Sequence, residues 1–189
     1  MLYLYTKRSG NINKMDIMRT VTNSTCKDNK MNTNEYDVTV VKVVDGDTVD
    51  VDIDLGFGIC LKDERVRIMG IDTPESRTSD RVEKLFGKAA SRRLGELLKN
   101  GAKLITTEDK SGEDMKGKFG RILGDFRAAD GRLVTQIMSE EGHCVPYHGG
   151  SKEDTQAQHE ANRVRLLADG VVDQADYDKM VLAEANEKK

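Results

Sequence analysis

The clearest hydrophobic pattern in the chain is a two-residue alternation along Thr48–Leu55. One face carries only apolar side chains and the other only carboxylates: Val49, Val51, Ile53 and Leu55 against Asp50, Asp52 and Asp54. Because successive strand residues point to opposite faces, this alternation predicts a half-buried antiparallel strand with one solvated face. The β-branched run Asp37–Val44 predicts a strand before it, with a turn at Asp45-Gly46 between the two.

The segments that follow complete a small barrel. A third strand is expected over Arg65–Ile71, and a fourth and a fifth over Ala102–Glu108 and Phe119–Arg127. Between the third and the fourth, Glu83–Asn100 repeats apolar residues at helical spacing and is followed by Gly101, a common helix stop. Five strands with a helix in this place follow the order of an OB-fold barrel.

Further helices are expected over Leu133–Glu141, Glu153–Ala168 and Asp173–Asn186. The predicted fold class is therefore α+β, mainly β, a five-stranded OB-fold barrel with about three helices and a last helical stretch beyond them. Residues 1–36 show neither the two-residue period of a strand nor the 3.6-residue period of a helix, and they are expected to form a flexible N-terminal extension. The globular domain is expected to span residues 37–170, and residues 171–189 to form a C-terminal helical tail.

The charge of the chain argues mildly against a simple nucleic-acid binder. Net charge is −3, and residues 37–170 hold 21 Lys and Arg against 25 Asp and Glu. Only residues 1–36 are basic, with six Lys and Arg against three acidic residues. Proteins that hold nucleic acid by their overall field are usually strongly basic. Any polyanion must therefore be held here by local groups.

Cysteine usage and hydropathy exclude several other classes. Cys26, Cys60 and Cys144 are widely spaced and form no C-x-x-C pair, which argues against a zinc site and a disulfide framework. Small buried thiols are expected instead. No apolar run approaches the roughly 18 residues of a membrane span, and the N-terminus lacks the order of a secretion signal. A cytoplasmic protein without a membrane partner is expected.

Three short polar strings stand where predicted strands end. They are VDGDTV at Val44–Val49, RIMGIDTPE at Arg67–Glu75 and KFGR at Lys118–Arg121. Taken singly, each has an ordinary explanation: an Asp-Gly turn is most often a hairpin, and D-T-P-E is most often a rigid loop. Arg67 could pair with the neighbouring acids of its own strand on the surface, an interaction of little energetic weight.

Read together, the strings predict a cluster of oxygen ligands. Pro74 forces the chain out of the third strand, so Asp72 at the strand end and Glu75 just beyond it are expected at one mouth of the barrel, beside the Asp47 turn. Carboxylates without cysteine or histidine suit calcium or magnesium better than zinc or copper.

In this order the three strings resemble the staphylococcal nuclease family. Its sequences carry D-G-D-T-V, then R-x-x-x-x-D-T-P-E, then a lysine-aromatic-G-R string. All three occur here with the internal spacing of the family, and the helix between the second and the third falls where the family places one. The resemblance covers about residues 37–170.

The resemblance implies catalytic roles for three residues. Arg67 and Arg121 would bind the scissile phosphate and neutralise the charge that develops in the transition state. Glu75 would hold or deprotonate the attacking water. A guanidinium presents a fork of donors that matches phosphate, and preorganised positive groups are the largest aid to a reaction that builds negative charge.

The resemblance also implies a metal and a substrate surface. Calcium would be held by the carboxylates of Asp47 and Asp72 and by the backbone carbonyl of Thr73. The residues implied to contact a neighbouring phosphate or base are Lys118, Phe119 and Tyr147. An aromatic ring at such a place stacks on a base and a lysine attracts a phosphate.

Two positions depart from the family pattern. Family members commonly have aspartate in place of Gly117 and tyrosine in place of Phe119, so substrate affinity and base preference are less well predicted than the chemistry. The histidines, His143, His148 and His159, match no histidine-based nuclease motif and are expected on the surface or in loops.

The expected function is calcium-dependent hydrolysis of DNA and RNA by a monomer that acts on single strands or locally open duplexes. The resemblance implies cleavage of the P–O5′ bond, which leaves 3′-phosphates. The alternative is an OB-fold module that binds nucleic acid without cutting it. The intact arginines and acids favour the enzyme. A protein-interaction domain, the third possibility, predicts no metal site.

Overall fold

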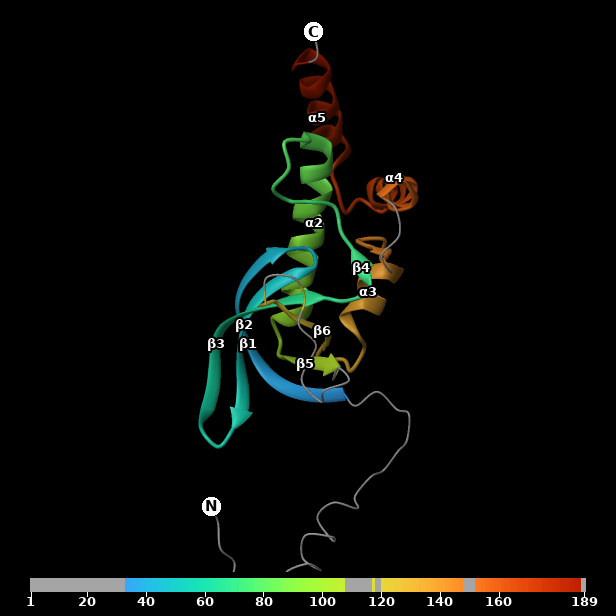
Figure 1. The fold of residues 1–189 in the computed structure, drawn as a ribbon. Helices are drawn as coiled ribbons and strands as arrows, with labels where there is room; N and C mark the ends of the chain where they lie inside the picture. The colour runs from blue at the N-terminus through green and yellow to red at the C-terminus, as the bar shows by residue number, and fades with distance from the viewer. Residues whose placement is uncertain (1–32, 108–116, 118–119, 148–151, 188–189) are drawn as a thin grey trace, which may run out of the picture. The chain divides into compact units, whose positions relative to one another are not determined.

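Five strands close into a barrel in the order β1-β2-β3-β6-β5 (Figure 1). The strands are β1 Thr33–Asp45, β2 Thr48–Gly56, β3 Ile59–Ile68, β5 Ala102–Thr107 and β6 Ile122–Arg127. Neighbouring strands are antiparallel except β3 and β6, which run parallel. This computed structural model describes residues 33–107, 117, 120–147 and 152–187. The expected mainly β barrel is confirmed in these residues.

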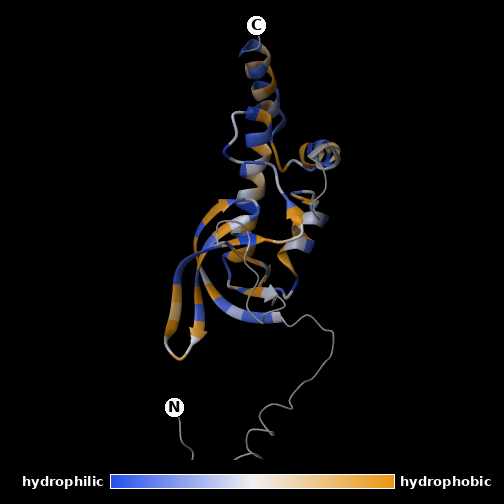
Figure 2. Ribbon diagram, in the orientation of Figure 1, coloured by the Kyte–Doolittle hydropathy of each residue, from blue (hydrophilic) through white to orange (hydrophobic). Residues whose placement is uncertain are grey.

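The barrel interior is apolar because alternate residues of each strand point inward, as the alternating colours along the strands in Figure 2 indicate. Val49 and Val51 of β2 are fully buried. Helix α2, Arg81–Leu98, adds Leu94 to the same core. Asp80 caps the start of this helix: its side chain accepts a hydrogen bond from Glu83 N–H at 2.7 Å, a standard way to satisfy the first free donors of a helix.

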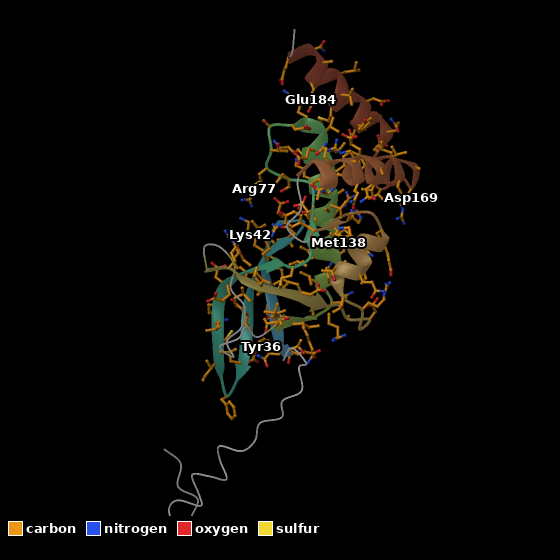
Figure 3. All side chains as sticks on the ribbon, turned by 45° about the vertical axis from the view of Figure 1, so that its right-hand side comes forward. Tyr36, Lys42, Arg77, Met138, Asp169 and Glu184 are labelled. Carbon is orange, nitrogen blue, oxygen red and sulfur yellow. The ribbon has the colours of Figure 1, made fainter. Side chains whose placement is uncertain are left out.

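The other helices are α3 Val134–Glu140, α4 Lys152–Ala168 and α5 Gln174–Glu187. A second apolar cluster joins α2 to the C-terminal part through Phe86, Leu166 of α4 and Val172. The segment expected as a helical tail therefore contacts the domain. Glu184 of α5 lies beside the start of α2 (Figure 3), where its carboxylate accepts hydrogen bonds from Arg81 N–H at 2.5 Å and Val82 N–H at 3.2 Å. No described helix is long and apolar enough to cross a membrane.

The expected third strand, Arg65–Ile71, is wrong at both ends. Strand β3 begins at Ile59 because its pairing with β2 continues past the barrel as a long hairpin. It stops at Ile68 because Gly70 has a φ of 77°, a left-handed conformation that ends an extended strand. A separate two-stranded ladder then pairs β4, Ile71–Asp72, with β7, Val145–Pro146.

The hairpin also overturns three burial expectations. Leu55 is 39% exposed, since it lies beyond the barrel and has no core to face. Cys60, expected to be buried, is exposed on the same hairpin, whereas Cys144 is buried and Cys26 lies outside the described residues. Asp50, expected on a solvated face, is 7% exposed because the Arg65 side chain bonds across it.

Two segment boundaries also differ from expectation. Thr33–Tyr36, assigned to the N-terminal extension, forms the start of β1 and pairs with β5. The rest of the extension, residues 1–32, lies outside the described part of the chain. The fifth barrel strand, β6, begins at Ile122 and not at Phe119, so Arg121 precedes the strand.

Candidate active site

A two-residue turn, Gly46 and Asp47, joins β1 to β2 and begins the site. The Asp45 carboxylate accepts hydrogen bonds from Gly46 N–H at 2.9 Å and from Ser76 N–H at 3.2 Å, so it ties the turn to the loop after β4. A Cβ atom at Gly46 would lie 2.9 Å from Thr73 Oγ1, closer than such atoms approach. Glycine therefore lets the first and second polar strings pack directly together.

Arg67 of β3 stands between two carboxylates. Its Nη1 lies 2.6 Å from Asp47 Oδ2, and its Nη2 lies 3.9 Å from Asp72 Oδ1. A continuous strand would place Arg67 and Asp72 on opposite faces. The turn at Met69-Gly70 resets the alternation, so the two side chains reach each other. Arg67 is thus paired inside the site, and the surface pairing with acids of its own strand is not what the structure contains.

Asp47 is a buried carboxylate, 4% exposed. Burial raises its pKa, and the carboxylates of Asp45 and Asp72 raise it further. Arg67 and the hydroxyl of Thr48, which donates to Asp47 Oδ1 at 2.7 Å, act in the opposite direction. The ionised form of Asp47 therefore depends on positive charge at this point.

Glu75 lies at the edge of the same site, and its pKa is raised by partial burial and then by Asp45, with Asp47 and Glu83 adding to the repulsion. Its backbone N–H donates to Glu83 Oε1 at 3.3 Å. The loop lies directly on α2, because a Cβ atom at Gly87 would come within 2.6 Å of the Glu75 carbonyl carbon. Gly87 therefore allows the close approach that sets the position of Glu75.

These groups surround one cleft of about 600 Å³. Its lining includes Asp47, Arg67, Glu75 and Arg121, which come from the β1–β2 turn, β3, the β4–α2 loop and the segment before β6. The carbonyl of Arg121 accepts a hydrogen bond from Gly117 N–H at 2.8 Å. The fold thus brings the three predicted catalytic residues and one predicted metal ligand to a single opening.

The remaining predicted site residues are placed differently. Asp72 is not among the described residues that line the cleft, but its carboxylate faces Arg67, which does line it. Thr73 is 5% exposed and packs against Gly46 in the turn. Tyr147 is 38% exposed and is not among the described residues that line the cleft, although its N–H donates to the Gly70 carbonyl at 2.9 Å. Lys118 and Phe119 lie outside the described residues.

The histidines were expected on the surface or in loops. His143 does lie in the loop between α3 and β7, although it is buried, whereas His159 is a buried residue of α4, so the expectation is wrong for His159. His143 is 4% and His159 is 7% exposed, and burial lowers the pKa of His143. His159 Nε2 lies 3.0 Å from Asp72 Oδ2. Helical spacing could have revealed this burial, because His159 shares a face of α4 with Leu166, which is 3% exposed. His148 falls in a part of the chain that the structure does not describe.

A hard divalent cation fits the donor set of the cleft. Among the residues that the structure describes, no three His, Cys, Asp or Glu side chains form a ready-made metal site. Asp47 and Asp72 nevertheless face one guanidinium from two sides, so both carboxylates already lie beside a positive charge. Calcium and magnesium accept one or two carboxylates with carbonyl and water oxygens completing the shell.

Sequence comparison relates this chain to known proteins. The family model described as Staphylococcal nuclease homologue matches residues 65–168. The SPbeta prophage-derived endonuclease YokF and the endonuclease YncB, both from Bacillus subtilis (strain 168), are each 35% identical over 106 and 105 residues. The thermonuclease of Staphylococcus intermedius is 36% identical over 101 residues.

These alignments cover 56%, 56% and 53% of this chain, and 32%, 45% and 54% of the respective relatives. The chain thus spans about a third to about half of the length of these three relatives. The family match begins at Arg65 and includes Arg67, Glu75 and Arg121, so it covers more than half of the 189 residues and all three predicted catalytic positions. The chain belongs to the staphylococcal nuclease homologue family.

Proposed function

We propose that this chain is a calcium-dependent nuclease that hydrolyses phosphodiester bonds in DNA and RNA. The observation that carries the proposal is the cleft itself, in which two arginines, Arg67 and Arg121, and the carboxylates of Asp47 and Glu75 line one opening. The relatives, which are named as two endonucleases and a thermonuclease, support the same reaction class.

The two arginines suit a reaction that increases negative charge. Attack of water on a phosphodiester adds charge to the phosphoryl oxygens, and guanidinium groups held in place stabilise that charge before the reaction begins. Arg67 is held by its contact with Asp47, and Arg121 lines the same cleft. We assign both to the scissile phosphate.

Glu75 is the proposed general base. In this step the water oxygen forms a bond to phosphorus, the water proton moves to Glu75, and the P–O5′ bond breaks. The departing 5′ oxygen takes up a proton from solvent water, which leaves a 5′-hydroxyl and a 3′-phosphate. A carboxylate with a raised pKa accepts a proton more readily than an ordinary one, and partial burial and the neighbouring Asp45 raise the pKa of Glu75.

Calcium is the proposed cofactor, held by the carboxylates of Asp47 and Asp72 with the Thr73 carbonyl. When bound there it polarises a phosphoryl oxygen and helps to position water. The chemistry of the ligands supports the choice, because the acids at this point repel one another and a hard cation would offset that repulsion.

The negative net charge of the chain favours substrates whose phosphates are easily reached, because the protein attracts nucleic acid only weakly by its overall charge. With a net charge of −3, the chain holds a polyanion chiefly through Arg67, Arg121 and the bound cation. We therefore propose single strands and locally open duplexes as substrates, cut by a monomer. The cytoplasmic location stays a prediction from the sequence.

The direct test is cleavage of a single-stranded oligonucleotide in calcium and in excess chelator. Loss of substrate only with calcium is expected, with product ends that are 5′-hydroxyl and 3′-phosphate. Calcium-independent cleavage contradicts the metal assignment. Salt-sensitive retention of an oligonucleotide that is never cut would show a binding module instead.

A matched pair of arginine variants tests the roles. Arg121→Ala is expected to lower the rate about 10² to 10³-fold, as removal of one transition-state donor does. Arg127→Ala removes an arginine that pairs with Glu35 on the surface, with Nη2 2.9 Å from Oε1, and is expected to leave the rate within about twofold. Equal losses in both variants would point to a general charge effect.

A further inference from the structure

A histidine outside the cleft contacts one of the proposed calcium ligands. His159 lies on α4, far along the chain from Asp72, and its Nε2 is 3.0 Å from Asp72 Oδ2. A carboxylate only accepts hydrogen bonds, so Nε2 must carry the hydrogen and donate it. The ring is 7% exposed, which shields this bond from competing water.

The Asp72 side chain needs a partner from another element to fix its orientation, because β4 is only a two-residue strand. It ends β4, a strand of two residues, and only its backbone is fixed by pairing with Val145 of β7. Its side chain is 35% exposed. One oxygen faces Arg67 at 3.9 Å and the other receives the His159 bond. Among the described contacts of this carboxylate, the His159 bond is the shorter.

Helix α4 holds the imidazole in place. One turn after His159, Asn162 Nδ2 donates to the Cys144 carbonyl at 3.1 Å, just before β7. Two turns after His159, Leu166 is 3% exposed in the cluster beneath α2. Helix α4 therefore bonds both to the segment that leads into β7 and to Asp72 of β4, and β4 pairs with β7. These contacts fix the position of the His159 ring relative to β4.

We infer that His159 is a positioning residue that fixes the Asp72 carboxylate, so that one oxygen stays directed toward Arg67 and the cleft. This inference rests on the proposed calcium-dependent nuclease function. A ligand whose far oxygen is held by a buried donor binds its metal without first losing rotational freedom. Loss of such a partner typically lowers metal affinity or activity by about 10 to 100-fold.

Two substitutions of similar length separate the effect of the hydrogen-bond donor of His159 from the effect of its side-chain volume. His159→Gln keeps an N–H donor near the place of Nε2, whereas His159→Met fills similar space without one. Calcium affinity measured by titration calorimetry is expected to fall about 10 to 100-fold in His159→Met and to stay within about threefold of the parent in His159→Gln. His143→Met, a change at a histidine that is also buried, is the control and is expected to leave the affinity unchanged.

The rate at saturating calcium supplies a second readout. His159→Met is expected to recover most of its cleavage rate when calcium is raised, because the defect lies in holding the ligand. Parental affinity and parental calcium dependence in a folded His159→Met protein would overturn the inference. So would equal losses in His159→Gln and His159→Met, which would indicate a packing role.

A readout without metal keeps the inference separate from the nuclease proposal. In protein with ¹⁵N-labelled histidine, ring correlations should show His159 with its hydrogen on Nε2, and Asp72→Ala should shift these signals but not those of His143. A hydrogen on Nδ1 would overturn the inference. If the parent binds calcium but cuts nothing, the nuclease proposal fails while the affinity comparison still decides the role of His159. A parent that binds no calcium contradicts both.

Discussion

Two aspartate–arginine pairs, Asp50–Arg65 and Asp47–Arg67, line the same cleft beside the β2–β3 ladder, and the electrostatics of their aspartates differ. Arg65 bonds to Asp50 through Nε at 2.7 Å and Nη2 at 2.9 Å, one donor to each oxygen. Arg67 bonds to Asp47 through Nη1 at 2.6 Å. The side chains of both aspartates are covered, at 9% and 6% exposure.

The pKa values of the two aspartates shift in opposite directions. The hydrogen bonds from Arg65 lower the pKa of Asp50, and Lys42 and Arg77 (Figure 3) add positive charge nearby. Burial raises the pKa of Asp47, whose other neighbours include acids. The first pair therefore stabilises the barrel in the usual way. The second holds a carboxylate where its charge is unfavourable without a cation, as expected of a site built for a ligand.

The largest expected effect comes from removing each arginine in turn. Arg67→Ala should lower kcat/KM on a single-stranded oligonucleotide about 10² to 10³-fold, because a phosphate-binding donor is lost. Arg65→Ala should cost less than about tenfold, because Arg65 is occupied by Asp50. Similar losses in the two variants would mean that both pairs serve the substrate.

Substitution of Asp47 and of Asp50 by asparagine should affect cleavage and folding stability in opposite ways. Asp47→Asn is expected to lower cleavage about 100-fold and yet raise the Tm measured in chelator, because it removes a buried charge repelled by its neighbours. Asp50→Asn should keep most activity and lower the free energy of unfolding by about 1 to 2 kcal/mol, through loss of a charge-assisted bond. A Tm decrease in Asp47→Asn would contradict the comparison.

Two glycines of α2, Gly87 and Gly95, test whether the close packing of the Glu75 loop on the helix matters for activity. A methyl group at Gly87 would meet the Glu75 carbonyl carbon at 2.6 Å, whereas one at Gly95 would meet Val43 at an ordinary 3.5 Å. Gly87→Ala should reduce the rate about tenfold and destabilise the protein by about 1 to 3 kcal/mol. Gly95→Ala should instead stabilise it by up to about 1 kcal/mol and leave the rate unchanged. Cleavage assays and urea unfolding measure both effects.

The smallest effect is the pH dependence of stability. Asp47 has a raised pKa in the folded protein, so its ionisation weakens folding as pH rises from 3.8 through the folded value. Asp50 has a lowered pKa, so its contribution is present above pH 3.8 and is lost as pH falls through the folded value. Urea unfolding in chelator should therefore show Asp47→Asn gaining, and Asp50→Asn losing, stability relative to the parent as pH increases. Parallel curves for the two variants would refute this assignment.

Much of the fold followed from local pattern. The alternation in β2 and the helical spacing of α2 gave bounds close to those observed, because each pattern records which side of an element faces apolar neighbours. The break after Ile68 was missed, because no pattern within the strand encodes the contacts made there: Met69 N–H bonds to Gly124 of β6, and the Gly70 carbonyl accepts from Tyr147 N–H. The hairpin from Leu55 to Leu61 was misjudged because pairing continues where the core ends.

The sequence by itself determined the chemistry available at the strand ends: two turns rich in carboxylates and two arginines in an order that matches one family. Local rules sufficed because Pro74 and the Gly46 turn act on their own neighbours. Only the tertiary structure decided which charges meet. Arg67 reaches Asp72 because a turn resets the strand alternation, and His159 reaches Asp72 because α4 packs across β7. Contacts of that range depend on how elements pack, and no periodicity within a single element encodes them.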